Sequence, residues 1–83
     1  MNKTYTAIIV TLTEDLTTKQ RGTALRSIGK LSGIFKAAMM EPGEKKFAWA
    51  YSDETRKAKD VIADIKHVPG VKSAEIPPAR YAA

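Results

Sequence analysis

Apolar residues follow two spacings along this chain, one typical of strands and one typical of helices. Four short segments are rich in β-branched, aromatic or small apolar residues: 5–12 (YTAIIVTL), 34–40 (IFKAAMM), 45–51 (KKFAWAY) and 71–76 (VKSAEI). In the first of them, Ile8, Val10 and Leu12 occupy alternate positions, and alternate side chains of a strand point to one face. These segments predict four β-strands.

Between the strands, apolar residues recur at helical spacing. One stripe follows the first strand and another follows the third: Ala24, Leu25, Ile28 and Leu31, then Ala58, Val61, Ile62 and Ile65. Thr17 and Gln20 have the spacing of a capping box at the start of the first helix. Gly33 suits the end of that helix. Ser52 or Asp53 is expected to cap the second helix.

The predicted element order is βαββαβ, with a type II turn in EPGE (41–44) between the second and third strands. Right-handed crossovers convert this order into a four-stranded antiparallel sheet with both helices on one face. This is an α+β fold of the ferredoxin-like type, in which the first and third strands are central. Pro77 and Pro78 stop the last strand, so we expect one domain over residues 1–78 and a short extended tail at 79–83.

The third strand raises the main question, because Phe47, Trp49 and Tyr51 alternate with Ala48 and Ala50. One face of this strand carries aromatic rings and the other carries methyl groups. The rings either fill the core, where each removes about 150–250 Å² from water, or form a surface on which other molecules stack. The alternation alone is compatible with both interpretations.

If the rings face outward, the same sheet face is expected to hold Tyr5, Ile9, Lys36 and Met40. The inner face would still have enough large apolar side chains for a small core: Ile8, Val10, Leu12, Leu25, Ile28, Leu31, Phe35, Val61, Ile62, Ile65 and Ile76. An exposed aromatic surface of this kind seldom stays uncovered.

Composition and charge narrow the function classes. The 83 residues carry a net charge of +5 with a pI near 9.6, which favours acidic partners such as nucleic acid or an acidic protein surface. There is no cysteine, and the one histidine, His67, is expected to meet free carbonyls at the end of the second helix. We therefore expect no metal site, no cofactor and no enzymatic activity. No apolar run approaches the ~20 residues of a membrane span, and we expect a cytoplasmic protein without membrane contact.

The segment KKFAWAYS (45–52) resembles the octapeptide of RNA-recognition motifs, K/R-G-F/Y-G/A-F-V-x-F/Y. Lys45, Phe47 and Ala48 match this pattern and Trp49 replaces one aromatic residue by another, whereas Lys46 and Ser52 depart from it. The resemblance covers residues 45–66. It implies that Phe47 and Trp49 stack on bases and that Lys45 meets phosphate. The expected binding surface is completed by Lys46, Tyr51, Tyr5, Ile9 and Lys36.

A second resemblance is to subtilisin propeptides and their free-standing inhibitor relatives. It is carried by the segments IIVTLTEDLT, KKFAWAYSDE and PGVKSAEIPP. In that family the C-terminal tail lies in the protease active site like a substrate. The resemblance therefore implies an alternative site formed by Pro78, Ala79, Arg80 and Tyr81.

Taken with the basic charge, these patterns predict a small non-enzymatic binding module. Its first expected partner is single-stranded nucleic acid, RNA or DNA, bound across an aromatic sheet face. The alternative is a protein partner: a protease or another acidic target that the chain inhibits, an adaptor role, or a second copy of the chain joined through the sheet.

Overall fold

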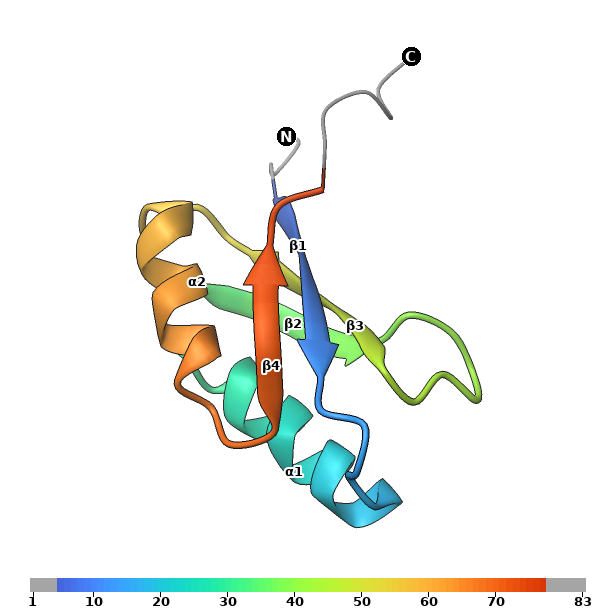
Figure 1. The fold of residues 1–83 in the computed structure, drawn as a ribbon. Helices are drawn as coiled ribbons and strands as arrows, with labels where there is room; N and C mark the ends of the chain where they lie inside the picture. The colour runs from blue at the N-terminus through green and yellow to red at the C-terminus, as the bar shows by residue number, and fades with distance from the viewer. Residues whose placement is uncertain (1–4, 78–83) are drawn as a thin grey trace.

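The computed structural model describes residues 5–77, which form one sheet and two helices (Figure 1). The elements follow the predicted βαββαβ order: β1 (Thr6–Leu12), α1 (Thr18–Gly29), β2 (Ile34–Met39), β3 (Phe47–Ser52), α2 (Ala58–Lys66) and β4 (Val71–Glu75).

The strands form a single four-stranded antiparallel sheet in the order β2-β3-β1-β4. β1 and β3 are therefore central, as predicted, and β2 and β4 are the two edges. Both helices cover the same face of the sheet (Figure 1), which confirms the ferredoxin-like α+β arrangement. We call the helix-covered face the inner face and the opposite one the outer face.

The core between the helices and the inner face contains no aromatic side chain among residues 5–77. Its buried members are aliphatic: Ile8, Val10, Leu12, Ala24, Ile28, Ile34, Ala48, Ala50, Val61, Ile65, Val68 and Ala74. Ala50 pairs with Ile8 and Ala48 with Val10 across the two central strands. Ala48 and Ala50 belong to the same buried cluster as the aliphatic residues of β1, α1 and α2, whose larger side chains fill the core.

The start of α1 is capped as predicted. The Thr17 hydroxyl accepts a hydrogen bond from the Gln20 backbone N–H at 3.1 Å, and the Gln20 side chain accepts one from the Thr17 N–H at 2.8 Å. This reciprocal pair satisfies donors that a helix start otherwise leaves free. The helix ends at Gly29, earlier than predicted, and Gly33 adopts its positive φ of 90° in the connection to β2.

The prediction that Ser52 or Asp53 caps α2 is wrong. Helix α2 begins at Ala58, its N-cap is Lys57, and no side chain caps it. The Ser52 hydroxyl instead accepts from the Glu54 N–H, and Asp53 Oδ1 accepts from the Thr55 N–H. These local bonds form a turn that delays the helix.

Two side chains predicted for the core are exposed. Phe35 is 59% exposed because the pairing of β2 with β3 shifts between Ile34 and Lys36, which makes Phe35 an extra residue in its strand. Such a bulge redirects the side chain that it contains. Ile76 is 48% exposed because β4 ends at Glu75, one residue earlier.

Candidate ligand-binding face of the sheet

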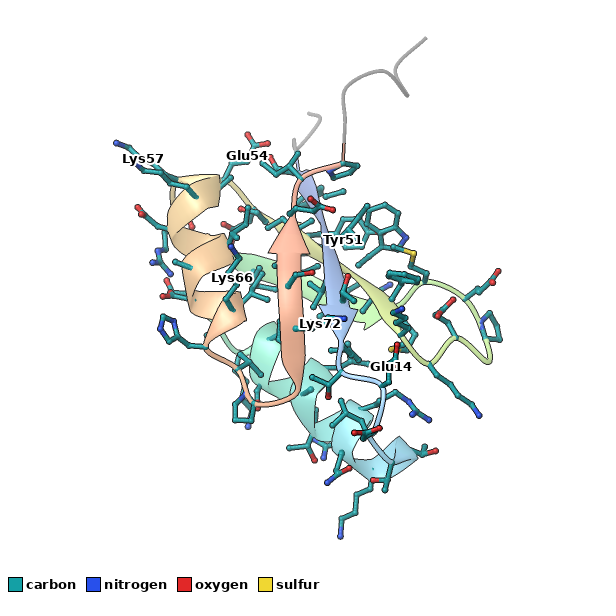
Figure 2. The ribbon with its side chains drawn as sticks, in the orientation of Figure 1. Glu14, Tyr51, Glu54, Lys57, Lys66 and Lys72 are labelled. Carbon is teal, nitrogen blue, oxygen red and sulfur yellow. The ribbon has the colours of Figure 1, made fainter. Side chains whose placement is uncertain are left out.

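β3 places its aromatic side chains on the outer face. Ala48 and Ala50 are 0% exposed on the inner side, whereas Phe47 is 36% exposed and Trp49 and Tyr51 are half-buried. Figure 2 shows Tyr51 on the side of the sheet away from both helices. Of the two interpretations of the alternation, the outward one is therefore correct.

The residues of β1 and β2 that pair with these rings carry no further ring. Trp49 lies between Ala38 of β2 and Ile9 of β1, and Tyr51 lies between Lys36 and Ala7. Phe47 lies opposite Thr11, and its carbonyl accepts a hydrogen bond from the Met40 N–H. Trp49 and Tyr51 stack on each other, with ring centroids 6.3 Å apart and an angle of 25° between their planes.

A second pair of rings lies at the Tyr51 end of this face. Tyr5, just before β1, stacks on Phe35 in the bulge of β2, with centroids 4.5 Å apart and 23° between the planes. Tyr5 was predicted for the outer face, but Phe35 was not. The bulge that places Phe35 here left no signal in the hydrophobic pattern.

All aromatic side chains of residues 5–77 thus gather on one face of the sheet. We call this set, Tyr5, Phe35, Phe47, Trp49 and Tyr51, the aromatic face. Small proteins usually bury their largest rings, which supply much of the free energy of burial. Here the core is aliphatic and the rings are left partly in contact with solvent, as at surfaces that bind other molecules.

Lysines surround the aromatic face. Lys36 lies opposite Tyr51, and Lys45 is exposed just before Phe47. The Lys46 ammonium lies 5.5 Å from the Phe47 ring centroid and 3.5 Å from Glu14 Oε1. Lysine near a ring is attracted by the π system, so Lys46 is held beside Phe47 by both a ring and a carboxylate.

A carboxylate fixes the backbone of these lysines. Glu44 Oε2 accepts hydrogen bonds from the N–H groups of Lys45, Lys46 and Phe47, at 3.2, 3.0 and 3.3 Å. The bonds from Lys46 and then Phe47 hold the pKa of the Glu44 carboxyl below its usual value, because they favour the ionised form. Pro42 and Gly43, whose φ is 85°, form the predicted turn, closed by the Glu44 N–H bonding to the Glu41 carbonyl.

Two further residues lie where they were predicted, and one predicted site lies outside the described residues. Ile9 lies on the outer face beside Trp49, as expected. The alternative tail site, residues 78–81, lies outside the described residues. His67 caps α2, and its Nδ1 lies 2.8 Å from the Ala63 carbonyl oxygen, as predicted.

Among residues 5–77, no three His, Cys, Asp or Glu side chains gather closely enough to hold a metal ion. Neither helix in this range is long and apolar enough to cross a membrane. Comparison of the chain with protein-family models, with curated proteins and with solved structures finds no match.

Proposed function

We propose that this protein binds single-stranded nucleic acid, RNA or DNA, across the aromatic face. The observation that carries the proposal is the outward alignment of Phe47, Trp49 and Tyr51 along a central strand whose intervening alanines are buried. Unpaired bases stack on such rings, and each stacked base contributes ~1–3 kcal/mol of binding free energy.

The surroundings of the rings favour recognition without strong sequence preference. Ala7, Ile9 and Ala38 adjoin Trp49 and Tyr51, and these side chains have no hydrogen-bonding groups with which to read base edges. Every base has a π face, so stacking tolerates all sequences. Thr11 and Lys36 are the nearest polar side chains in the same rows.

Lys36, Lys45 and Lys46 supply positive charge at both ends of the line of rings. A strand lying along β3 would pass from the Lys45 and Lys46 end toward Lys36, with its phosphates near their ammonium groups. If all of them neutralise phosphates, the logarithm of the binding constant should fall with the logarithm of salt concentration with a slope of about −2.

The test uses Trp49, the only tryptophan, as its own reporter. Its fluorescence is measured while mixed-sequence single-stranded oligonucleotides are added at low and at high salt. We expect quenching at low salt that is largely lost at high salt, and little quenching by a duplex, whose bases are already stacked. Emission that is indifferent to oligonucleotide at every salt concentration would overturn the proposal.

Variants locate the binding site. Phe47→Ala keeps the tryptophan reporter and is expected to weaken binding about 5- to 100-fold through loss of one stacking platform. Ile76→Ala is the matched control, because Ile76 is also exposed and apolar but is not part of the aromatic face. Equal affinity of these two variants would place binding elsewhere on the molecule.

A protein partner is the second candidate, favoured by the two pairs of stacked rings on the outer face. Trp49 and Tyr51 contact each other, as do Tyr5 and Phe35, and joined aromatic surfaces are common in protein interfaces. A second copy of the chain is the simplest such partner. Sedimentation over a range of concentrations tests it: a dimer that is abolished by Trp49→Ala and unaffected by oligonucleotide would favour this candidate.

A salt-resistant protease inhibition that disappears when residues 78–83 are deleted would favour the inhibitor alternative.

A further inference from the structure

The Tyr5–Phe35 pair reaches across the end of β3. Ser52, the last residue of β3, pairs with Thr6 of β1 on one side and with Ile34 of β2 on the other. Tyr5 and Phe35 are the chain neighbours of Thr6 and Ile34, and they come from the two strands that flank β3. Because their rings stack at 4.5 Å, they meet above β3 at the level of its last residues.

This position continues the line of rings on β3. Phe47, Trp49 and Tyr51 occupy every second residue, a spacing of about 6.6 Å along a strand, and the Trp49 and Tyr51 centroids are 6.3 Å apart. The next position, residue 53, is an aspartate whose carboxylate bonds to Thr55. The Tyr5–Phe35 pair therefore lies where β3 itself supplies no further ring.

The bulge in β2 makes this possible. Lys36 pairs with Tyr51 on the outer face and Ala37 with Ala50 on the inner face, so without the extra residue the same alternation would send Phe35 toward the core and Ile34 outward. Instead Ile34 is buried and both Phe35 and Lys36 are exposed. A phenylalanine that is 59% exposed leaves much of its ring surface in contact with water. Bulges of this kind commonly redirect a side chain next to a functional site.

The pair is also preorganised for stacking on a base. Each ring covers one face of the other, with 23° between their planes, so the two hold each other in place while Phe35 keeps exposed surface. A ring that is already fixed loses little conformational freedom when a base stacks on it. Lys36 follows Phe35 in the chain and is exposed beside Tyr51, which places a positive charge next to the pair for the phosphate of the same nucleotide.

We propose that the Tyr5–Phe35 pair is a fourth stacking platform, so that the aromatic face takes four consecutive nucleotides of a single strand: on Phe47, Trp49, Tyr51 and the pair. This inference rests on the proposed function. The 6.3 Å spacing is larger than the roughly 3.4 Å rise between stacked bases in a duplex strand. The bound strand is therefore extended, with each base unstacked from its neighbour and stacked on a ring.

The test measures affinity as a function of length, using oligodeoxythymidines from two nucleotides upward and fluorescence of Trp49. For the wild type, affinity should rise with each nucleotide up to the fourth and then change little. Phe35→Ala should remove the gain in affinity from the third to the fourth nucleotide, about 5- to 100-fold, and should weaken binding of shorter oligonucleotides only slightly, because they can still bind on the other three rings. Phe35→Leu, which keeps an apolar contact with Tyr5 but has no ring, should lose the same gain in affinity, which we call the fourth-nucleotide step.

Further variants separate this inference from the proposed function. Tyr5→Ala should reproduce the loss, and the Tyr5 and Phe35 double variant should lose no more than either single one, because the pair acts as a unit. Ile76→Ala should retain the step. If Phe35→Ala and Phe35→Leu leave the step in place, or weaken short and long oligonucleotides equally, the fourth platform is wrong while the proposed function stands. If no oligonucleotide binds the wild type, both are wrong.

Discussion

Glu14 Oε1 lies 3.5 Å from the Lys46 ammonium, which also faces the Phe47 ring. Both charged side chains are well exposed, with 42% of Lys46 and 71% of Glu14 accessible to solvent. Exposed ion pairs of this kind contribute only ~0.2–1 kcal/mol. The contact therefore matters more for the charge beside Phe47 than for the stability of the fold.

Replacing Glu14 should increase affinity for nucleic acid. In Glu14→Gln the Lys46 ammonium loses its carboxylate and becomes fully available to phosphate, so we expect about a two- to fivefold tighter complex at low salt. Asp15→Asn is the control, because Asp15 is an exposed neighbour with the same charge. Titrating both variants with oligonucleotide separates the effect of the local ion pair from the effect of net charge. An equal gain in affinity in the two variants would contradict a specific role for the Glu14–Lys46 contact.

Substitutions at two adjacent residues of β3 should affect different properties: stability at Ala50 and oligonucleotide binding at Trp49. Ala50 is fully buried in the aliphatic core, so Ala50→Leu overpacks the core and should lower the free energy of unfolding by about 1–3 kcal/mol. Trp49→Ala should cost less stability but weaken oligonucleotide binding about 5- to 100-fold. Urea unfolding and binding of a fluorescently labelled oligonucleotide measure the two effects. Loss of binding without loss of stability in Ala50→Leu would argue against the assignment of the two faces.

Arg56, two residues before α2, ties this helix to the rest of the fold. Arg56 Nη1 donates to Asp64 Oδ2 at 2.7 Å and to the Ser32 carbonyl at 3.0 Å, and thereby joins the start of α2 to the connection before β2. The pair is partly exposed, so we expect Arg56→Ala to lower the free energy of unfolding by only about 1 kcal/mol. Lys57→Ala, an exposed neighbour, is the control. Amide exchange should show the greatest loss of protection in the first turn of α2; uniform loss across the molecule would contradict this role.

The separation of rings and methyl groups onto opposite faces of β3 was predictable, because period-two alternation constrains a central strand strongly; which face the rings take was left open. Rings and methyl groups on opposite faces leave only two arrangements, and the other apolar residues sufficed for the core. The capping box of Thr17 and Gln20 was equally readable, because it depends on two residues three positions apart. These features depend on short-range spacing, which a sequence displays directly.

The features that the sequence did not reveal depend on pairing between strands or on competition between local bonds. A one-residue shift in the β2–β3 register moved Phe35 from the expected core to the aromatic face, and hydrophobic periodicity contains no sign of such a shift. Asp53 has the composition of a helix cap, but its bonds to Thr55 form a turn instead. Both misassignments concern segments beside the end of β3, where the proposed fourth platform lies.

Glu44 should stabilise the fold in a pH-dependent way. Backbone N–H groups of Lys46, Phe47 and Lys45 lower the pKa of its carboxyl in the folded protein. A carboxyl with a lowered pKa contributes stability above its unfolded pKa, and this contribution is lost as pH falls through the folded pKa. The difference in free energy of unfolding between the wild type and Glu44→Gln should thus be full at neutral pH and disappear below the ordinary glutamate range of about 4 to 5. Urea unfolding over a pH series measures it, and a difference that grows on acidification would contradict the prediction.

Glu44→Gln also shows whether Glu44 affects binding by positioning the backbone of Phe47 or only through its charge. Removing an acidic charge next to Lys45 and Lys46 would, by electrostatics alone, tighten nucleic-acid binding. Glu41→Gln, which removes a charge from the same turn but none of the three backbone bonds, should show this small gain. Glu44→Gln should instead weaken binding about two- to threefold, because a neutral amide accepts these hydrogen bonds less strongly and the backbone of Phe47 is held less firmly. Oligonucleotide titration of the two variants decides between them: a gain in both would mean that Glu44 acts only through its charge, and a loss confined to Glu44→Gln that it positions the first stacking ring.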